Sequence, residues 1–166
     1  IDFYLMHAMN KERWDSMLEI GCVERLVQLK EEGKIKYLGF SFHDSYEAFE
    51  EILTYRDWDF AQIQLNYMDI NEQAGIKGYE LAEEKGIPLV IMEPIKGGSL
   101  ATLPSDVVAP FKKAHPEWSD ASWALRFVAS HENVKVILSG MSTLEQVEDN
   151  INTFSNLEEL TKEELE

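Results

Sequence analysis

Five short apolar runs, each followed by a segment of helical periodicity, dominate the hydrophobic pattern of the chain. The runs are rich in β-branched and aromatic residues and have the length of strands, and they cover residues 1–7, 35–42, 60–67, 88–95 and 134–140. Strand and helix therefore alternate five times. This order predicts an α/β fold with a parallel sheet and right-handed crossovers.

The helical segments carry their apolar residues on one face. The first spans residues 17–31 and is expected to end at Gly33, and the second is expected to begin at Asn71 and to stop at Gly86. In the longest gap, a Pro/Ser-rich loop over residues 103–116 precedes a helix that Ser119 or Asp120 caps and whose Ala121, Ala124, Leu125 and Val128 face inward.

The chain ends with two further helical segments. Residues 143–154 place four apolar side chains on one face of a helix, and the acidic residues 158–166 predict a short final helix. The four side chains are Leu144, Val147, Ile151 and Phe154.

Two architectures fit this alternation, an open doubly wound sheet and part of a closed (β/α)₈ barrel. No Gly-rich phosphate fingerprint follows the first strand, which favours the barrel. A closed barrel needs about 250 residues, and this chain has 166 and begins abruptly with a strand. We therefore expect a single domain over residues 1–166 that is a partial barrel truncated at its N-terminus.

Charge and composition exclude several classes of function. Acidic side chains outnumber basic ones by 31 to 15, for a net charge of −16, and no Lys/Arg run exceeds a pair, so nucleic acid is not an expected partner. No run approaches the roughly 18 apolar residues of a membrane helix, and no cleavage signal opens the sequence, so we expect no membrane contact and a cytoplasmic location. The four histidines lack metal-ligand spacing and the single cysteine excludes a thiolate cluster, so no metal site is predicted.

Polar side chains gather where each apolar run ends, and in parallel α/β folds the C-terminal ends of the strands carry the active site. The five groups are His7, residues 41–44, the trio Gln62, Gln64 and Asn66, residues 93–98, and residues 139–142. His7 fits a general acid or base, or an electrophile that polarises a carbonyl group. Position alone favours the alternative, a core histidine that only satisfies a loop carbonyl. Gln62 and Gln64 share one side of their strand.

Two of these strand ends fit an anion. Lys96, Gly97 and Gly98 offer backbone amides and one cation for a phosphate, or they form a flexible turn with a solvated lysine. Gly140 to Ser142 directly precede a helix whose N-terminal amides could hold an anion. Plain N-capping by Ser142 or Thr143 explains the same residues.

Together, the strand ends resemble the aldo-keto reductase family over nearly the whole chain. IDFYLMH is similar to the family's D-x-Y-L-x-H, GKIKYLGFSFHD to GKIRYIGVSN, FAQIQLNYMD to VQVEYNP, GIPLVIMEPIKGG to GIPVxAYSPLGGG, and VKVILSGMSTLEQVEDNI to V-x-x-IPGxSxPEQLEENL. The five motifs occur in the family's order, starting at its fourth strand. The resemblance implies a TIM barrel of which this chain holds five βα units, strands four to eight.

Within the family, the chain looks most like a bacterial subgroup whose barrel is followed by a ferredoxin-like cysteine cluster. Such a cluster is absent from this sequence. The resemblance implies an oxidoreductase that uses NADP or NAD, with a slight preference for NADP, to reduce a small aldehyde or ketone. His7 falls on the family's catalytic histidine, which orients the carbonyl group. The Asp, Tyr and Lys that complete the catalytic set precede it in the family, so this chain alone is expected to be inactive.

The same resemblance assigns cofactor-binding residues. Ser41 and Gln62 match the residues that bind the nicotinamide carboxamide, whereas Phe42 replaces an asparagine and cannot donate that bond. Met92 stands where an aromatic ring covers the nicotinamide, and Glu93 replaces a serine. The pyrophosphate segment matches Pro94, Ile95, Gly97 and Gly98, and the adenosine-binding segment matches Gly140, Met141, Ser142, Gln146, Asp149 and Asn150.

The substrate side and the oligomeric state follow from weaker signals. Ala8, Met9 and Asn66 are the residues we expect near a substrate. Many NADP-specific members have basic residues at positions 141 and 146, where this chain has Met141 and Gln146. The preference for NADP over NAD therefore stays open here. The alternative to an enzyme is a non-catalytic nucleotide-binding or scaffold module on the same fold.

Five parallel strands leave two open edges and an uncovered apolar interior face, so we expect the chain to self-associate.

Overall fold

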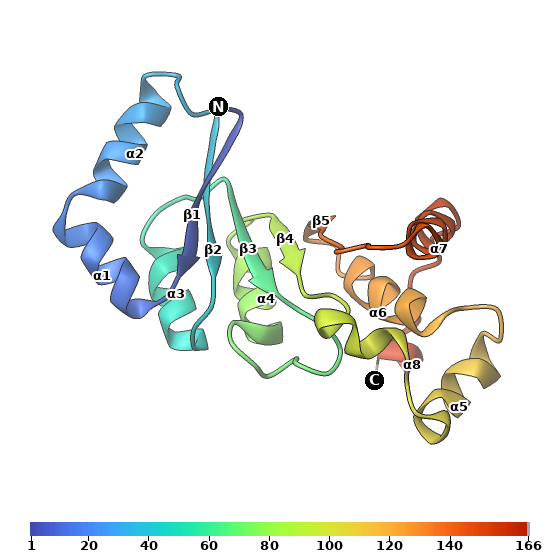
Figure 1. Cartoon of the computed structure of the whole chain (residues 1–166). Coiled ribbons are helices and arrows are strands. Elements are labelled where there is room, and N and C mark those ends of the chain that lie inside the picture. Colours follow the sequence, from blue (N-terminus) through green and yellow to red (C-terminus); the bar gives the residue numbers. More distant parts are fainter. Residues whose placement is uncertain (166) are drawn as a thin grey trace.

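The computed structural model describes residues 1–165, which form one five-stranded parallel sheet with helices between consecutive strands (Figure 1). The strands lie in the sheet in chain order. They are β1 (Phe3–Met9), β2 (Tyr37–Phe42), β3 (Phe60–Gln64), β4 (Leu89–Met92) and β5 (Val134–Ile137). A doubly wound sheet reverses its order at a switch point. The unbroken order is that of a (β/α) barrel, which confirms the second of the two predicted architectures.

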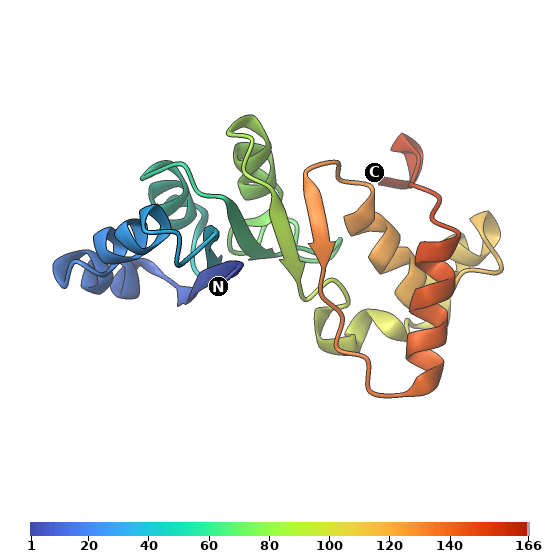
Figure 2. The ribbon, with the colours of Figure 1, turned by 90° about the horizontal axis from the view of Figure 1, so that it is seen from above.

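Helices surround the row of strands, the blue to green ones beside the N-terminal strands and the orange and red ones beyond the last strand, as Figure 2 shows from above. They are α1 (Lys11–Glu19), α2 (Cys22–Glu31), α3 (Tyr46–Thr54), α4 (Gly75–Glu84), the 3₁₀ segment η1 (Lys96–Ala101), α5 (Ser105–Ala114), α6 (Asp120–Ala129), α7 (Leu144–Ser155) and α8 (Lys162–Leu165). No helix in residues 1–165 combines the length and the apolar character needed to cross a membrane.

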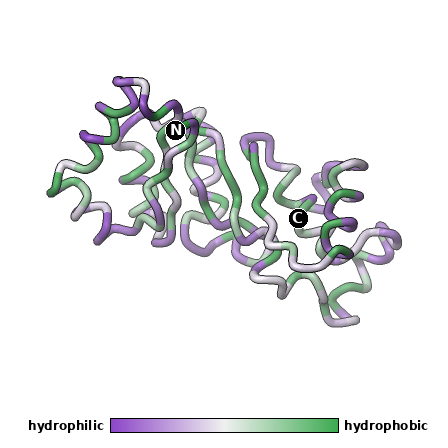
Figure 3. Tube along the Cα trace, turned by 45° about the horizontal axis from the view of Figure 1, so that its top comes forward, coloured by the Kyte–Doolittle hydropathy of each residue, from purple (hydrophilic) through white to green (hydrophobic). Residues whose placement is uncertain are grey.

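The core lies between the sheet and these helices. Leu38, Phe40 and Ile63 alternate along their strands toward this side and are at most 1% exposed, and Figure 3 shows the hydrophobic segments gathered along the strands. The opposite face of the sheet is open. Near the N-terminal ends of the strands it presents Phe3 at 66% and Tyr37 at 37% exposure. This half of the interior face is apolar, as the sequence predicts.

The helix predicted over residues 17–31 is two helices. The chain breaks at Gly21, whose φ of +67° is one that a side chain disfavours, and Ile20 beside it is 71% exposed. Gly33 follows α2 with a φ of +73° and confirms the predicted end. The next helix, predicted from Asn71, begins only at Gly75 because residues 69–74 form a turn.

The loop predicted over residues 103–116 contains helix α5, with Pro110 inside it. The Pro/Ser content argues against a helix, but Phe111 stacks on Trp123 of α6 at 4.9 Å between ring centroids. Packing on α6 thus outweighs the local preference.

The final helices follow the prediction at their ends. Thr143 caps α7 in a capping box with Gln146, and Ser119 caps α6. The apolar face predicted for α7 is largely exposed, with Leu144 at 68% and Ile151 at 60%. The predicted acidic helix is reduced to the single turn α8.

Candidate functional site

A cleft of 580 Å³ opens at the C-terminal ends of β4 and β5. Its volume is within the range of small-molecule sites in proteins. One wall is the segment after β4, and the other is the loop between β5 and α7. Eleven of the residues predicted for cofactor binding line it: Met92, Glu93, Pro94, Ile95, Gly97, Gly98, Gly140, Met141, Gln146, Asp149 and Asn150. The structure thus brings together two segments that lie more than 40 residues apart in the sequence.

The wall after β4 is a turn built from unusual backbone conformations. Glu93 and Lys96 have φ of +56° and +48°, and Gly97 and Gly98 have φ of +61° and +93°. A Cβ added to Gly98 would meet no atom within 4 Å, so the backbone here faces open space. Positive φ in residues other than glycine is costly and persists where surrounding contacts impose it. The contacts that impose it here come from β3.

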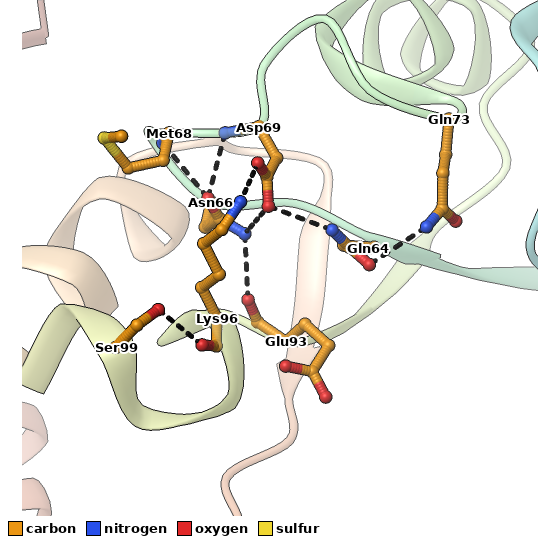
Figure 4. Close-up of polar contacts among 8 residues, drawn as sticks. All are labelled: Gln64, Asn66, Met68, Asp69, Gln73, Glu93, Lys96 and Ser99. Atoms are coloured by element: carbon orange, nitrogen blue, oxygen red, sulfur yellow. Dashed lines mark hydrogen bonds and ion pairs between the residues drawn. The ribbon is translucent and has the colours of Figure 1, made fainter.

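Asn66, just after β3, provides the central contact (Figure 4). Its side chain is fully buried, and its Nδ2 donates to the backbone oxygen of Glu93 at 3.1 Å and to Oδ2 of Asp69 at 3.0 Å. Its Oδ1 accepts from the backbone amides of Met68 and Asp69 at 3.0 Å. All hydrogen-bonding groups of this amide are therefore used within the protein, and the substrate contact predicted for Asn66 does not fit its surroundings.

Asp69 joins the same network to the cleft wall. Asp69 is 6% exposed, and its carboxylate accepts from Asn66, from Gln64 and from the ammonium group of Lys96. The hydrogen bond from Lys96 lowers the pKa of Asp69 despite its burial, with Asn66 and Gln64 adding to the effect. Gln73, with a φ of +54°, extends the network by donating to Gln64 at 3.1 Å. Lys96 is thus engaged with Asp69, and the prediction of a cation available to a phosphate is not supported.

The second wall begins at the N-terminus of α7. Oε1 of Gln146 accepts from the backbone amides of Ser142 at 2.7 Å and Thr143 at 3.2 Å. Thr143 Oγ1 accepts in return from the amide of Gln146 at 3.3 Å. The helix caps its own amides, so of the two interpretations of this loop the N-capping one is confirmed.

The ends of β1 and β2 form a neighbouring polar edge. His7 is exposed, alternates with the buried Met6 and therefore lies on the open face of the sheet, and its side chain has no hydrogen bond within residues 1–165. Ala8 follows with a φ of +50° in a bulge of β1. The buried Ser41 stabilises this bulge, because its Oγ accepts from the Ala8 amide at 2.7 Å.

Gln62 connects this edge to the cleft. It is the register partner of Ser41 on one side and of Val90 on the other, and its Nε2 lies 3.4 Å from the sulfur of Met92. Ser41, Gln62 and Met92 therefore lie next to one another on the open face from β2 to β4.

Two predicted residues are placed elsewhere. The side chain of Phe42 is fully buried against Phe49, at 5.2 Å between ring centroids, so it points into the core and away from the open face. Met9 is 3% exposed and belongs to the same core. Both predictions are corrected for the same reason: the bulge at Ala8 and the strand alternation turn these apolar side chains toward the helices.

Asp69 and Gln73 are not among the site residues that the sequence predicts. Neither follows a strand directly, and the partners of Asp69 lie up to 27 residues away in the sequence. The one available signal is the positive-φ cluster around them, which only the structure reveals. Among the described residues, no group of three or more His, Cys, Asp or Glu side chains is arranged to hold a metal ion.

Comparison with known proteins gives concordant results. The sequence profile of the Aldo/keto reductase family matches residues 1–166. A curated relative, pyridoxal 4-dehydrogenase from Microbacterium luteolum, is 24% identical over 163 aligned residues, which cover 87% of this chain and 47% of that protein.

Solved structures share the fold. The holo form of aldo-keto reductase AKR11C1 from Bacillus halodurans superposes with a TM-score of 0.77 at 23% identity, covering 99% of this chain and 58% of that chain. An aldo/keto reductase from Klebsiella pneumoniae in complex with NADP and acetate gives 0.73 at 21% identity, covering 99% and 56%. The chain thus spans about half the length of the relatives it matches. With its parallel strands in barrel order and a family profile that matches from end to end, this chain belongs to the aldo-keto reductase family.

Proposed function

We propose that this chain holds the dinucleotide site of an oxidoreductase that reduces a small aldehyde or ketone with a nicotinamide cofactor. The observation that carries the proposal is the cleft, where the two segments predicted to hold pyrophosphate and adenosine form opposite walls. Membership of the aldo-keto reductase family supports it. So does the relative from Klebsiella pneumoniae, whose structure contains NADP.

The residues present fit such a cofactor at three places. The turn at Gly97 and Gly98 carries no side chain, and the space at Gly98 is open, so a pyrophosphate can approach its backbone closely. Met92 offers an apolar, polarizable surface beside the amide of Gln62, which suits a nicotinamide ring with its carboxamide. Asp149 and Asn150 offer polar groups at the other end of the cleft.

His7 is the one side chain of the chain to which we assign a role in catalysis. When bound, a reduced nicotinamide supplies a hydride to a carbonyl carbon. The imidazole of His7 is exposed on the same open face as Ser41 and Gln62, so it can donate a hydrogen bond to a carbonyl oxygen and orient it. The family's Asp, Tyr and Lys have no counterparts here, so we propose that this chain binds the cofactor but does not turn over by itself.

Separate measurements of binding and turnover test this proposal. Titration of NADH and NADPH fluorescence with the chain is expected to show saturable binding, whereas nicotinamide absorbance with an added aldehyde is expected to stay constant. Gly98→Val fills the open space at the turn, and we expect it to weaken binding by about tenfold or more. Gly86→Val is the matched control, because Gly86 also has a positive φ, +67°, and open space but lies outside the cleft. Failure of both cofactors to bind the wild-type chain would contradict the proposal.

A second candidate function is nucleotide binding without catalysis. The burial of Phe42 favours it, because no side chain stands at that position to bind the nicotinamide carboxamide. The whole natural protein discriminates between the two functions. Aldehyde-dependent oxidation of NADH or NADPH supports the enzyme, and binding without turnover supports the second function.

A further inference from the structure

The side of the cleft formed by α7 lacks the positive charge that an additional phosphate there would require. Of the side chains that line it, Glu93 and Asp149 are acidic and none is Lys, Arg or His. We call the second wall of the cleft, formed by the loop between β5 and α7 and the start of α7, the α7 wall. The sequence contains no Lys, Arg or His from Val136 to Thr161, a stretch that includes this whole wall. Lys96, the basic residue next to the turn, is paired with Asp69 and does not line the cleft.

Two backbone amides at the start of the α7 wall are also already engaged. A helix N-terminus holds an anion through its unpaired amides, but Gln146 already accepts from the amides of Ser142 and Thr143. A phosphate that used these two amides would have to displace Gln146 from both bonds and would gain no cation among the residues that line the cleft. It would also lie in the same cleft as the carboxylate of Asp149.

Asp149 is suited to a different ligand group. One of its oxygens, Oδ2, accepts from Ser119 at 2.6 Å, while Oδ1 has no donor within residues 1–165. A carboxylate oxygen with spare acceptor capacity attracts a hydroxyl group, and acidic side chains bind the free ribose hydroxyls of NAD in other dinucleotide sites. The same oxygen repels a phosphate, which carries nearly two negative charges at neutral pH.

We propose that the α7 wall selects an adenosine ribose without a 2′-phosphate, so that the cleft takes NAD(H) in preference to NADP(H). This rests on the proposed function, since it concerns the same cleft, and it reverses the slight preference for NADP drawn from the sequence. Gln146 and Asp149 are the specificity-determining residues: the first occupies two backbone amides at the start of the helix, and the second leaves one acceptor oxygen for a hydroxyl group.

Calorimetric titration of the chain with 5′-AMP and with adenosine 2′,5′-bisphosphate tests the selection directly, without any turnover. The titration is run at physiological ionic strength, where the Debye length of about 8 Å screens the net charge of the whole chain. NADH and NADPH are titrated in parallel by fluorescence. We expect the ligands without the 2′-phosphate to bind at least about tenfold more tightly.

The variant Gln146→Lys separates the local effect from the total charge. It releases the two amides and adds a cation at the wall, so the affinity for the 2′-phosphorylated ligands is expected to rise about tenfold, with little change for NADH. The matched control is Ile151→Lys, which adds the same charge to an exposed position of α7 outside the cleft and is expected to leave the preference unchanged. Far-UV circular dichroism verifies that both variants fold.

The outcomes separate this inference from the proposed function. Tighter binding of NADPH than of NADH by the wild-type chain, or equal gains from both lysine variants, overturns the selection while leaving the dinucleotide site in place. Absence of binding for all four ligands removes the proposed function and this inference together. The proposed function and this inference are both supported if the wild-type chain binds NADH more tightly than NADPH and if Gln146→Lys, but not Ile151→Lys, reduces that difference in affinity.

Discussion

Asn66 ties the end of β3 to the end of β4 through a hydrogen bond of 3.1 Å from its Nδ2 to the backbone oxygen of Glu93. Glu93 is the first residue after β4, has a φ of +56° and lines the cleft. A fully buried side chain on one strand end thus holds the strained backbone that begins the cleft wall on the next.

Replacing Asn66 by alanine is expected to lower the free energy of unfolding by about 1–3 kcal/mol, since it leaves the amide of Met68 without an acceptor and removes one of the two hydrogen bonds of the Asp69 amide and of the Glu93 carbonyl. Urea denaturation measures this. We also expect weaker nucleotide binding because the turn loses its anchor. Asn71→Ala, at an exposed position of the same loop, is the control and should change stability by less than about 0.5 kcal/mol. A similar loss in both variants would contradict the anchoring role.

Asp69 makes the free energy of unfolding depend on pH in the acidic range. Its pKa is lowered in the folded state, first by Lys96, so its contribution to stability is complete above the ordinary value of 3.8 and is lost as the pH falls through the lowered value. Asp69→Asn removes this contribution. The difference in unfolding free energy between wild type and variant is therefore expected to be about 1–2 kcal/mol at pH 7 and to shrink below pH 3.8.

Urea titrations of both proteins from pH 7 to pH 3 measure this difference, and the other carboxylates cancel because both proteins carry them. Glu72→Gln, an exposed change in the same loop, is the control and should show no such trend. A difference between wild type and Asp69→Asn that stays constant with pH would contradict the assignment.

The sequence predicts the strands well because local chemistry determines them. Runs of β-branched and aromatic residues give all five strands within a few residues of their ends, and capping residues such as Thr143 and Ser119 give the helix starts correctly. The predictions fail where tertiary packing decides. Helix α5 forms against Trp123 in spite of Pro110, and the apolar face predicted for α7 is largely exposed.

In the candidate site, too, the features that local sequence determines are predicted and those that tertiary packing determines are not. The cleft walls come from motifs that are contiguous in the sequence, and eleven of the residues predicted from them for cofactor binding lie in the lining of one cleft. The network of Asp69, Lys96 and Gln73 is assembled from separate loops, and its signal is a backbone conformation that residue types do not encode. Phe42 illustrates the limit: its position in a motif predicts the open face, whereas its aromatic ring is buried in the core.

Phe42 provides a test of that correction. Its ring packs on Phe49 in the core, so Phe42→Ala is expected to lower the free energy of unfolding by about 3–5 kcal/mol through the cavity it leaves. Phe42→Leu, which keeps most of the apolar volume, should lose less and remain folded. Nucleotide affinity of the leucine variant is expected to equal that of wild type, and a large fall in its affinity would place the ring in the site instead.

His7 is expected to matter for chemistry and not for stability. It is exposed and has no hydrogen bond within residues 1–165, so His7→Gln should change the free energy of unfolding by less than about 0.5 kcal/mol. In the whole natural protein, the same change is expected to lower kcat for carbonyl reduction by about a hundredfold or more, with nucleotide affinity unchanged. His43→Gln, at an exposed position after β2, is the control. Equal rates for wild type and His7→Gln would remove His7 from the mechanism.

The open face of the sheet leads us to expect that the isolated chain self-associates. Phe3, Tyr37 and Val136 are between 37% and 66% exposed on this face, and a second copy of the chain is the occupant that we propose for it. The net charge of −16 opposes nonspecific aggregation, so a defined dimer is expected, with a mass about twice 19.1 kDa by light scattering. Phe3→Glu places a charge in the contact and should shift the protein toward monomer, whereas Ile20→Glu, on an exposed site between α1 and α2, should not. A wild-type chain that stays monomeric at all concentrations would contradict this expectation.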